Sequence, residues 1–266
     1  MQIDRTSCLE LLNGFGINPS KDKGQNYLIN PNTAKRIADA LSTDKDDNVL
    51  EIGPGLGSLT YFLNEKTGNL SVVDIDEQSC NVLRKLYPSL NVLNQNALET
   101  KVDEYERVIS NVPYSITSEL IEYILLNGKK LKQCVFMVQE DAYKRIVSLK
   151  GKDYGPLAVL LSLKGSVKTL FKVGSNDFLP RPKCASVVFE INLFEEQQLT
   201  NEQYKVIKTL FTNRRKTLLN NLLLLTNKER ATSLLEELKL PLTVRPEELS
   251  PETYYKLVSL YFTKGK

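Results

Sequence analysis

The chain has 266 residues, 41% of them hydrophobic, which is enough for one α/β domain of about 190 residues and a smaller second domain. A disordered or fibrous protein is therefore excluded. With no histidine and four widely separated cysteines, the chain lacks the ligand spacing of a structural zinc site and the base of a His-based triad. The net charge of +3 excludes a uniformly basic or acidic protein.

The sequence shows neither a signal-peptide pattern nor an apolar run of the roughly 20 residues that a membrane span needs. We therefore expect a cytoplasmic protein with reduced thiols, no membrane contact and no bound metal.

The N-terminal segment predicts two short helices joined by a polar turn. Helical patterns cover residues 6–13 and 31–41. The turn between them contains Gln25 and Asn26, whose amides suit the polar end of a ligand. Turn formation alone explains an Asn in such a place equally well.

Strands and helices then alternate, which is typical of a parallel sheet covered on both faces. Ligands of such sheets bind at the carboxyl ends of the strands, and Gly53, Asp74, Asn96 and Asn111 lie at or just beyond such ends. The expected strands are 48–52, 70–74, 91–95, 106–110 and 133–138, and the expected helices are 58–65, 77–86 and 117–126.

The segment Glu51–Gly57 joins the first of these strands to a helix through three glycines. Gly53, Gly55 and Gly57 permit positive φ and let a ligand lie against bare backbone. The spacing differs from the dinucleotide pattern, and Asp74 ends the next strand, where a carboxylate can accept both hydroxyls of an adenosyl ribose. A tight connection is the plain alternative, but together these features predict a Rossmann-like methyltransferase domain that binds S-adenosylmethionine.

The segment Ser110–Tyr114 is the most specific stretch of the sequence. A methyltransferase that acts on an exocyclic amine must direct the nitrogen lone pair at the methyl group. The Asn111 carboxamide oxygen and the Val112 carbonyl can accept the amine hydrogens, and Tyr114 can stack on the base while Pro113 fixes the turn. A plain strand-to-helix turn remains the alternative.

Basic residues gather in the middle of the chain, where residues 129–183 carry 12 Lys and Arg against 4 Asp and Glu. This excess favours a polyanionic substrate, although a solvated lysine-rich surface explains the same count. We expect a helix to about Lys164 and strands near 167–173 and 185–192. The prolines of the loop between those strands hold Phe178 where it can meet a base.

The pattern is helical after Glu195, so we place a domain boundary near residue 193. The expected organisation is a methyltransferase domain over residues 1–193 and a small all-helical domain, which binds RNA or the ribosome, over residues 194–266. Arg214, Arg215 and Lys216 are expected on a helix of the second domain.

These motifs resemble those of the small-subunit rRNA adenine dimethyltransferases, whose core is shared with the macrolide-resistance rRNA methyltransferases. The likeness covers almost the whole chain. It is carried by Gly24–Leu28, Glu51–Gly57, Asn111–Tyr114 and Phe178–Ser186, and in the C-terminal part by Asn213–Asn220 and Arg245–Ser250. The resemblance implies two methyl transfers to each of two adjacent adenines near the 3′ end of small-subunit rRNA, by a monomer acting on rRNA or an immature small subunit.

The resemblance also implies roles for particular residues. The cofactor contacts are Gln25, Asn26, Leu28, Gly53, Gly55, Asp74, Asn96 and Asn111, and the residues that hold the target adenine are Asn111, Tyr114 and Phe178. Asn96 stands where the family normally has Asp, so the bond to the cofactor adenine's amine lacks a carboxylate charge, which weakens it by about 1 kcal/mol.

Two other functions fit the same motifs. One is a resistance-type methyltransferase of large-subunit rRNA, against which stand the extension before Gly24 and the basic C-terminal segment. The other is a catalytically silent RNA-binding assembly or transcription factor, for which the substituted Asn96 is the hint. Cofactor binding followed by methyl transfer to RNA separates these functions.

Overall fold

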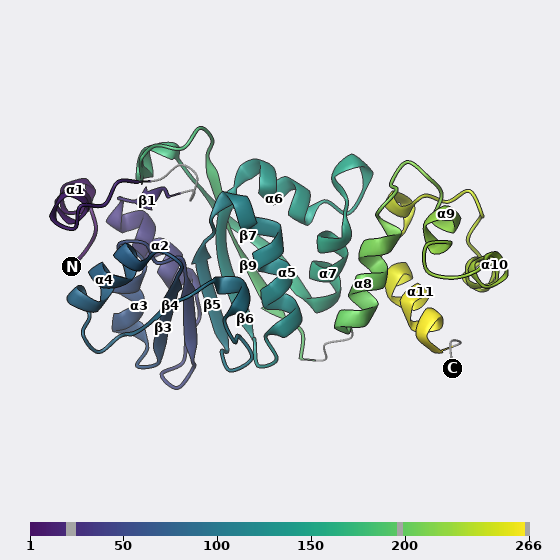
Figure 1. Ribbon diagram of the computed structural model, residues 1–266, viewed down its shortest axis with the longest axis horizontal. Helices are drawn as coiled ribbons and strands as arrows, with labels where there is room; N and C mark the ends of the chain where they lie inside the picture. The colour runs from purple at the N-terminus through teal and green to yellow at the C-terminus, as the bar shows by residue number, and fades with distance from the viewer. Residues whose placement is uncertain (20–24, 196–198, 264–266) are drawn as a thin grey trace. The chain divides into compact units, whose positions relative to one another are not determined.

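The structure, a computed structural model, describes residues 1–19, 25–195 and 199–263, without the side chain of Tyr114 (Figure 1). The first residue of the predicted Gly24–Leu28 motif therefore lies outside the described residues. The fold is α/β in its larger part, and it comprises two compact units.

The division of the chain differs in one respect from the sequence prediction. The first unit comprises Met1–Tyr143 and Val167–Leu193, and the second comprises Lys144–Ser166 and Phe194–Lys266. Residues 144–166 join the second unit because α7 (Pro156–Lys164) is apolar on almost every side and packs against α8 (Asn201–Leu210) and α11 (Pro251–Thr263).

A seven-stranded sheet in the order β4-β3-β2-β5-β6-β9-β7 forms the centre of the first unit. The pairs that join β4, β3, β2, β5 and β6 are parallel, as predicted, whereas β9 runs antiparallel to β6. The strands are β2 (Val49–Ile52), β3 (Leu70–Asp74), β4 (Asn91–Asn94), β5 (Arg107–Asn111), β6 (Gln133–Gln139), β7 (Gly165–Val173) and β9 (Ser186–Leu193).

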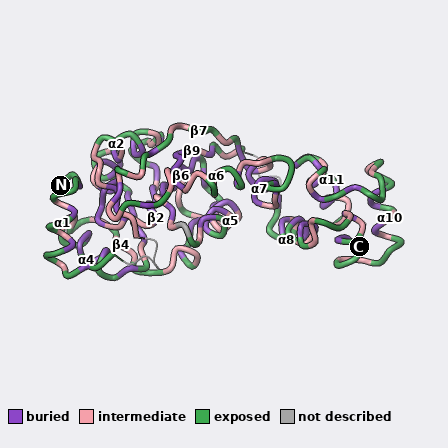
Figure 2. The backbone as a smooth tube through the Cα atoms, turned by 90° about the horizontal axis from the view of Figure 1, so that it is seen from above, coloured by how far each residue is buried: buried purple, intermediate pink, exposed green. Residues whose placement is uncertain are grey.

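The helices of the first unit cover this sheet. One sheet face, which includes Val49, Val72, Ile109 and Val135, forms a continuous core with α2 and α3. Figure 2 shows buried residues gathered along the central strands, as expected for strands with apolar side chains on both faces. The helices are α1 (Arg5–Gly14), α2 (Pro31–Ala40), α3 (Thr60–Lys66), α4 (Glu77–Leu86), α5 (Thr117–Asn127) and the first half of α6 (Glu140–Val147), whose residues from Lys144 on belong to the second unit.

A second, two-stranded sheet joins segments that are far apart in the sequence. β1 (Tyr27–Leu28) pairs antiparallel with β8 (Phe178–Leu179), so that Leu28 lies opposite Phe178. Asp177 fixes the same junction, because its carboxylate accepts hydrogen bonds from Asn30 Nδ2 at 3.0 Å and from Thr33 Oγ1 at 2.7 Å. The motif around Gln25 is thereby tied to the predicted aromatic loop.

The second unit is helical except for the first residues of β7. Its helices are α7, α8, α9 (Leu218–Leu222), α10 (Lys228–Glu237) and α11. Tyr154, Phe211 and Tyr254 form an aromatic cluster in its core, with the Tyr254 hydroxyl donating to the Pro246 carbonyl at 2.7 Å.

The predicted helix at Arg214, Arg215 and Lys216 is wrong, because these residues form a turn between α8 and α9. Arg214 Nη2 donates to the Gly151 carbonyl at 3.1 Å, and Leu218 N donates to the Val244 carbonyl at 2.7 Å. Hydrogen bonds to distant segments therefore replace the helical bonds that the local pattern predicts.

None of the helices in the described part of the chain combines the length and the hydropathy required to cross a membrane. Three of the four cysteines, Cys8, Cys80 and Cys134, are buried, and Cys184 is half-buried; all four are free thiols.

Candidate functional site

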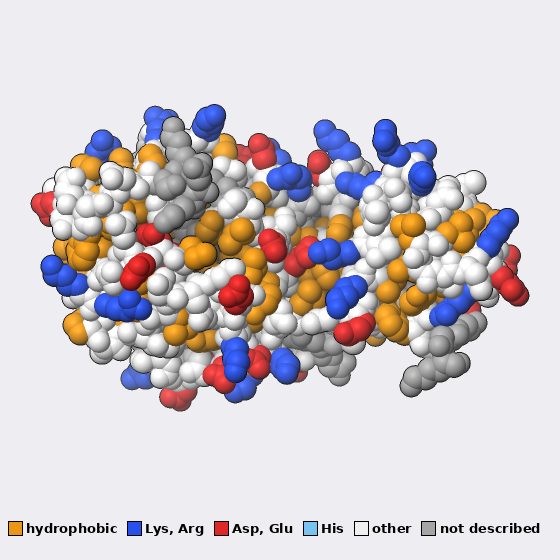
Figure 3. Space-filling view, in the orientation of Figure 1, with side chains coloured by type: hydrophobic (Ala, Val, Ile, Leu, Met, Phe, Trp, Pro, Cys, Tyr) orange, Lys and Arg blue, Asp and Glu red, His pale blue; other side chains and the backbone are white. Residues whose placement is uncertain are grey.

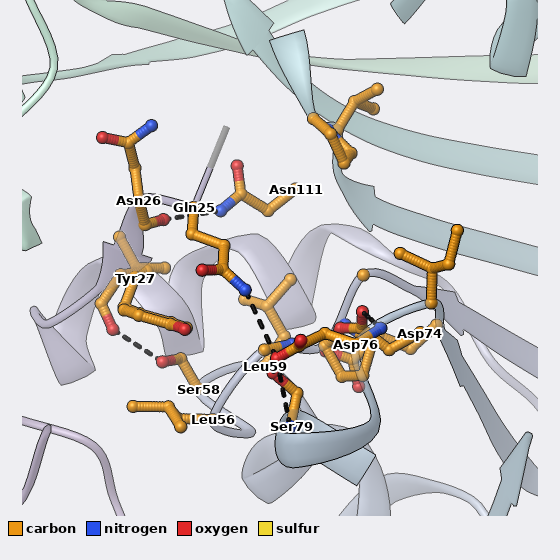
Figure 4. Close-up of a pocket in the computed structure, with 18 residues that line it drawn as sticks. Gln25, Asn26, Tyr27, Leu56, Ser58, Leu59, Asp74, Asp76, Ser79 and Asn111 are labelled. Atoms are coloured by element: carbon orange, nitrogen blue, oxygen red, sulfur yellow. Dashed lines mark hydrogen bonds between the residues drawn. The ribbon is translucent and has the colours of Figure 1, made fainter. Parts of the chain in front are cut away.

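A pocket opens where β2, β3 and β5 end, at the edge of the sheet that the sequence predicts (Figure 4). β1 and the residues before it supply another part of its wall. The predicted residues that line this pocket are Gln25, Asn26, Leu28, Gly53, Gly55, Asp74 and Asn111. Segments from four distant parts of the chain therefore meet in one cavity.

The glycine turn after β2 forms part of the pocket lining. Gly55 and Gly57 both have positive φ, at 55° and 92°. A Cβ atom on Gly55 would lie 3.1 Å from the Tyr27 ring, and one on Gly57 would lie 2.9 Å from Leu83 Cδ2. Both positions therefore require glycine for the backbone conformation and for the close approach of neighbouring side chains.

Asp74 organises the turn at the end of β3. Its Oδ1 accepts from Asp76 N at 2.9 Å and its Oδ2 accepts from Gly55 N at 3.3 Å. The carboxylate is thus held between the glycine turn and the start of α4, with its side chain half-buried at the pocket wall. This position matches the one that the sequence predicts for a ribose-binding acid.

Asp76 connects the same turn to the segment before β1. Its Oδ2 accepts from Ser79 N at 3.3 Å and Ser79 Oγ at 3.0 Å, which caps α4, and it also accepts from Gln25 Nε2 at 3.3 Å. Asp76 is only 6% exposed. Sequence reasoning missed this residue, although an Asp followed three positions later by Ser at the start of a helical pattern is a recognisable N-cap signal.

Glu51 is a third carboxyl group in the pocket wall, and it is fully buried. Thr60 Oγ1 donates to its Oε2 at 2.7 Å. Burial raises the pKa of Glu51 to about 8; the hydrogen bond from Thr60 opposes this rise, and the nearby charge of Asp74 adds to it. The sequence showed Glu51 as part of the glycine motif but gave no sign that it would face the pocket.

Asp74 and Asp76 give the pocket its negative charge, whereas the raised pKa of the buried Glu51 keeps that carboxyl group protonated at neutral pH. Among the described residues that line the pocket there are Glu51, Asp74 and Asp76, and neither Lys nor Arg. Such a site favours a ligand with positive charge over an anion such as a dinucleotide pyrophosphate. The described residues contain no group of three or more carboxylates or thiols arranged to hold a metal ion.

Asn111 ends β5 and lines the pocket together with Val112 and Pro113. Its Nδ2 lies 3.5 Å from the Asn26 carbonyl oxygen, at the long end of the hydrogen-bond range, and this contact turns Oδ1 away from Asn26 (Figure 4). Val112 N donates to the Met137 carbonyl at 3.0 Å, which holds the segment against β6. The Tyr114 side chain, the predicted stacking partner, lies outside the described part of the chain.

Phe178 does not occupy the position that the sequence predicts. It is only 2% exposed and packs in the core with Leu28, Ala34 and Val188. The expectation of a ring presented from a stiff loop is wrong for this structure, because pairing of β8 with β1 turns the ring into the core. Phe178 supports the pocket through Leu28 and is not among its lining residues.

Asn96 is also absent from the described lining of the pocket. It caps a single turn of 3₁₀ helix, since its Oδ1 accepts from Leu98 N at 3.0 Å, and its Nδ2 donates to Glu99 Oε1 at 3.4 Å. Both the oxygen and the nitrogen of the Asn96 amide therefore make hydrogen bonds within this turn.

The basic segment 129–183 carries less free charge than the sequence count indicates. Lys164 is 3% exposed, and Lys132, Lys168 and Lys172 form ion pairs with acidic residues at 3.2, 3.5 and 3.0 Å. Exposed Lys and Arg side chains nevertheless project from the surface (Figure 3). The remaining basic residues of the segment are all exposed: Lys129, Lys130, Lys144, Arg145, Lys150, Lys152, Arg181 and Lys183.

Comparison with known proteins gives a consistent result. The family model described as ribosomal RNA adenine dimethylase matches residues 17–262. A protein named ribosomal RNA small subunit methyltransferase A from Malacoplasma penetrans is 35% identical over 246 residues, which is 90% of each chain. A protein of the same name from Alkaliphilus metalliredigens is 33% identical over 258 residues, again 90% of each chain.

Solved structures agree on the fold. A dimethyladenosine transferase from Plasmodium falciparum has a TM-score of 0.78 at 26% identity and covers 90% of this chain and 98% of its own. The 23S rRNA methyltransferase ErmE has a TM-score of 0.65 at 22% identity, covering 88% of this chain and 98% of its own, and shows likeness of fold alone. The predicted Rossmann-like methyltransferase fold is confirmed. The family match and the identity across nine tenths of the chain together show that this chain belongs to the ribosomal RNA adenine dimethylase family.

Proposed function

We propose that this chain uses S-adenosylmethionine to methylate the exocyclic amine of adenine in small-subunit rRNA, twice on each of two adjacent adenines near the 3′ end. The observation that carries the proposal is that Asp74, at the end of β3, and Asn111–Pro113, at the end of β5, line the same pocket. A cofactor site and an amine-binding site are thus neighbours. The names of relatives about one third identical to this chain support the choice of substrate.

The pocket suits this cofactor in charge and in hydrogen-bonding groups. A wall with the carboxylates of Asp74 and Asp76 and, among its described residues, no basic side chain favours a sulfonium and an ammonium group. Asp74 would bind the ribose hydroxyls, and Gln25, Asn26, Leu28 and the turn at Gly53 and Gly55 would hold the methionine end. When bound, S-adenosylmethionine supplies a methyl group on a positively charged sulfur, which a nitrogen lone pair can attack.

Asn111 would prepare the adenine amine for this attack. The lone pair of the amine is delocalised into the ring, and acceptors that hold its hydrogens favour the geometry in which the lone pair is available. Asn111 Oδ1 points away from Asn26, and the adjacent Val112 carbonyl offers a second acceptor at the same strand end. The nitrogen loses one proton for each methyl group that it gains. Tyr114 would stack on the base.

RNA would be held by a wider surface than the pocket. A pocket for one adenine cannot select among many adenines, so phosphate contacts must fix the register. The exposed Lys and Arg residues of segment 129–183, together with Arg215 and Lys216, are suited to this task. The proposal also includes action as a monomer in the cytoplasm.

Methyl transfer to purified small-subunit particles tests the proposal. Wild-type protein with labelled S-adenosylmethionine should produce dimethyladenine in small-subunit rRNA. Asn111→Ala should lower turnover about 100-fold or more, as is typical for the loss of one positioned hydrogen-bonding group, while RNA affinity stays the same. Labelling of large-subunit rRNA instead, or binding of particles without transfer, would favour the resistance-type enzyme or the silent assembly factor.

A further inference from the structure

We propose that Asp76 is a positioning residue for the cofactor: it holds the Gln25 carboxamide so that the oxygen, rather than the nitrogen, is offered to the ammonium group of the ligand. The inference rests on the proposed S-adenosylmethionine site. It concerns a residue that the sequence motifs did not single out.

The geometry around Asp76 points to this role. One oxygen, Oδ2, lies 3.3 Å from Gln25 Nε2, 3.3 Å from Ser79 N and 3.0 Å from Ser79 Oγ. Asp76 and Ser79 are buried, so this carboxylate has few positions open to it. Its backbone N–H also donates to Asp74 Oδ1 at 2.9 Å. Asp76 therefore connects the predicted ribose acid to the segment at Gln25.

A carboxylate fixes which end of an amide faces it. An ionised carboxylate only accepts hydrogen bonds, so the Gln25 NH₂ group must face Asp76. The amide oxygen then points the other way, as Figure 4 shows. An oxygen acceptor in the pocket wall suits an ammonium group and is a poor partner for a carboxylate. The arrangement thus selects the amino group of a ligand that carries an α-amino acid end.

The N-cap of α4 alone does not require an Asp. Ser is an equally favoured N-cap residue, but its side chain is one atom shorter and would not reach Gln25. Asn has the same length as Asp, and its Oδ1 can accept from both Ser79 and Gln25 without carrying charge. Asp76→Ser therefore keeps the helix cap but loses the contact that orients the Gln25 amide. Asp76→Asn keeps both the cap and the contact but loses the charge.

The test compares two ligands that differ in the amino acid end. S-adenosylhomocysteine carries this end, 5′-methylthioadenosine lacks it, and neither has a sulfonium charge. Asp76→Ser should weaken binding of S-adenosylhomocysteine about tenfold and leave 5′-methylthioadenosine within about twofold, measured by isothermal titration calorimetry. Asp76→Asn should restore binding of S-adenosylhomocysteine to within about threefold of wild type.

A double variant asks whether Asp76 acts through Gln25. If it does, Gln25→Ala should weaken binding of S-adenosylhomocysteine about as much as Asp76→Ser does. The double variant should then bind this ligand no more weakly than either single variant. Additive losses, or equal losses for the two ligands, would overturn the proposal and leave Asp76 as a helix cap. Gln25→Ala leaves the cap of α4 in place, so it still tests the ligand difference if Asp76→Ser does not fold. Failure of the wild type to bind either ligand would count against the proposed function instead.

Discussion

The pocket at the strand ends and the exposed part of segment 129–183 carry opposite charge. The described pocket wall contains the carboxylates of Asp74 and Asp76 without a basic residue, whereas eight Lys and Arg residues of the segment are exposed. A net charge of +3 conceals this separation. The difference matches the two ligands of the proposed reaction, because the cofactor is a cation and RNA is a polyanion.

The largest expected effect comes from removing the basic charge. Neutral residues in place of Lys144, Arg145, Arg181 and Lys183 should weaken binding to small-subunit particles about 100-fold and lower the salt slope by up to about four units, if each side chain meets a phosphate. Filter binding across potassium chloride concentrations measures both quantities.

A matched control for this variant is present in the same segment. Lys168 and Lys172 already pair with Glu190 and Glu140, so the change Lys168→Gln with Lys172→Gln should alter the salt slope by less than about one unit. Equal slopes for the two variants would mean that the basic residues form only a solvated surface.

A smaller effect, on the stability of the fold, is expected from Glu51, the buried carboxyl group of the pocket. With the pKa of Glu51 raised from 4.5 to about 8, the folded chain keeps a proton that the unfolded chain has lost, so the free energy of unfolding falls as the pH rises between these values. Glu51→Gln should remove this dependence and raise the melting temperature at pH 8.5 relative to wild type. Parallel pH profiles for the two proteins in thermal unfolding would show that Glu51 is ionised throughout.

The smallest effect is expected at Asn96. An Asp there would still cap Leu98 N, but it would place a carboxylate beside Glu99, where the amide nitrogen now donates. Because Asn96 is not among the described lining residues, Asn96→Asp should change the dissociation constant of S-adenosylmethionine by less than about threefold. A tenfold gain in affinity would show that this position binds the cofactor directly.

Much of the framework could be predicted from local pattern. The strand before Gly53 has apolar residues at three of its four positions without strict alternation, and a strand of this kind belongs in the middle of a parallel sheet. Asp74 and Asn111 are the last residues of β3 and β5, so topology alone brings them to one edge of the sheet. Positive φ at Gly55 and Gly57 agrees with the predicted turn.

What could not be predicted depends on contacts between distant segments. Phe178 is buried because β8 pairs with β1, which lies about 150 positions earlier in the chain, and the two-residue strands carry no local signal. The free charge of the basic segment depends on partners such as Glu190 for Lys168. Asp76 is an ordinary N-cap in the sequence, and only the folded chain brings Gln25 to it.

The most direct test of this separation of charge is one paired binding measurement. The dissociation constants of S-adenosylmethionine and of small-subunit particles are determined for Asp74→Ala and for the variant neutral at 144, 145, 181 and 183. We expect Asp74→Ala to weaken cofactor binding about 10- to 100-fold with unchanged particle binding, and the neutral variant to show the reverse. If either variant weakens the binding of both ligands alike, the pocket and the basic residues are not separate binding regions. That result would contradict the proposed separation of charge.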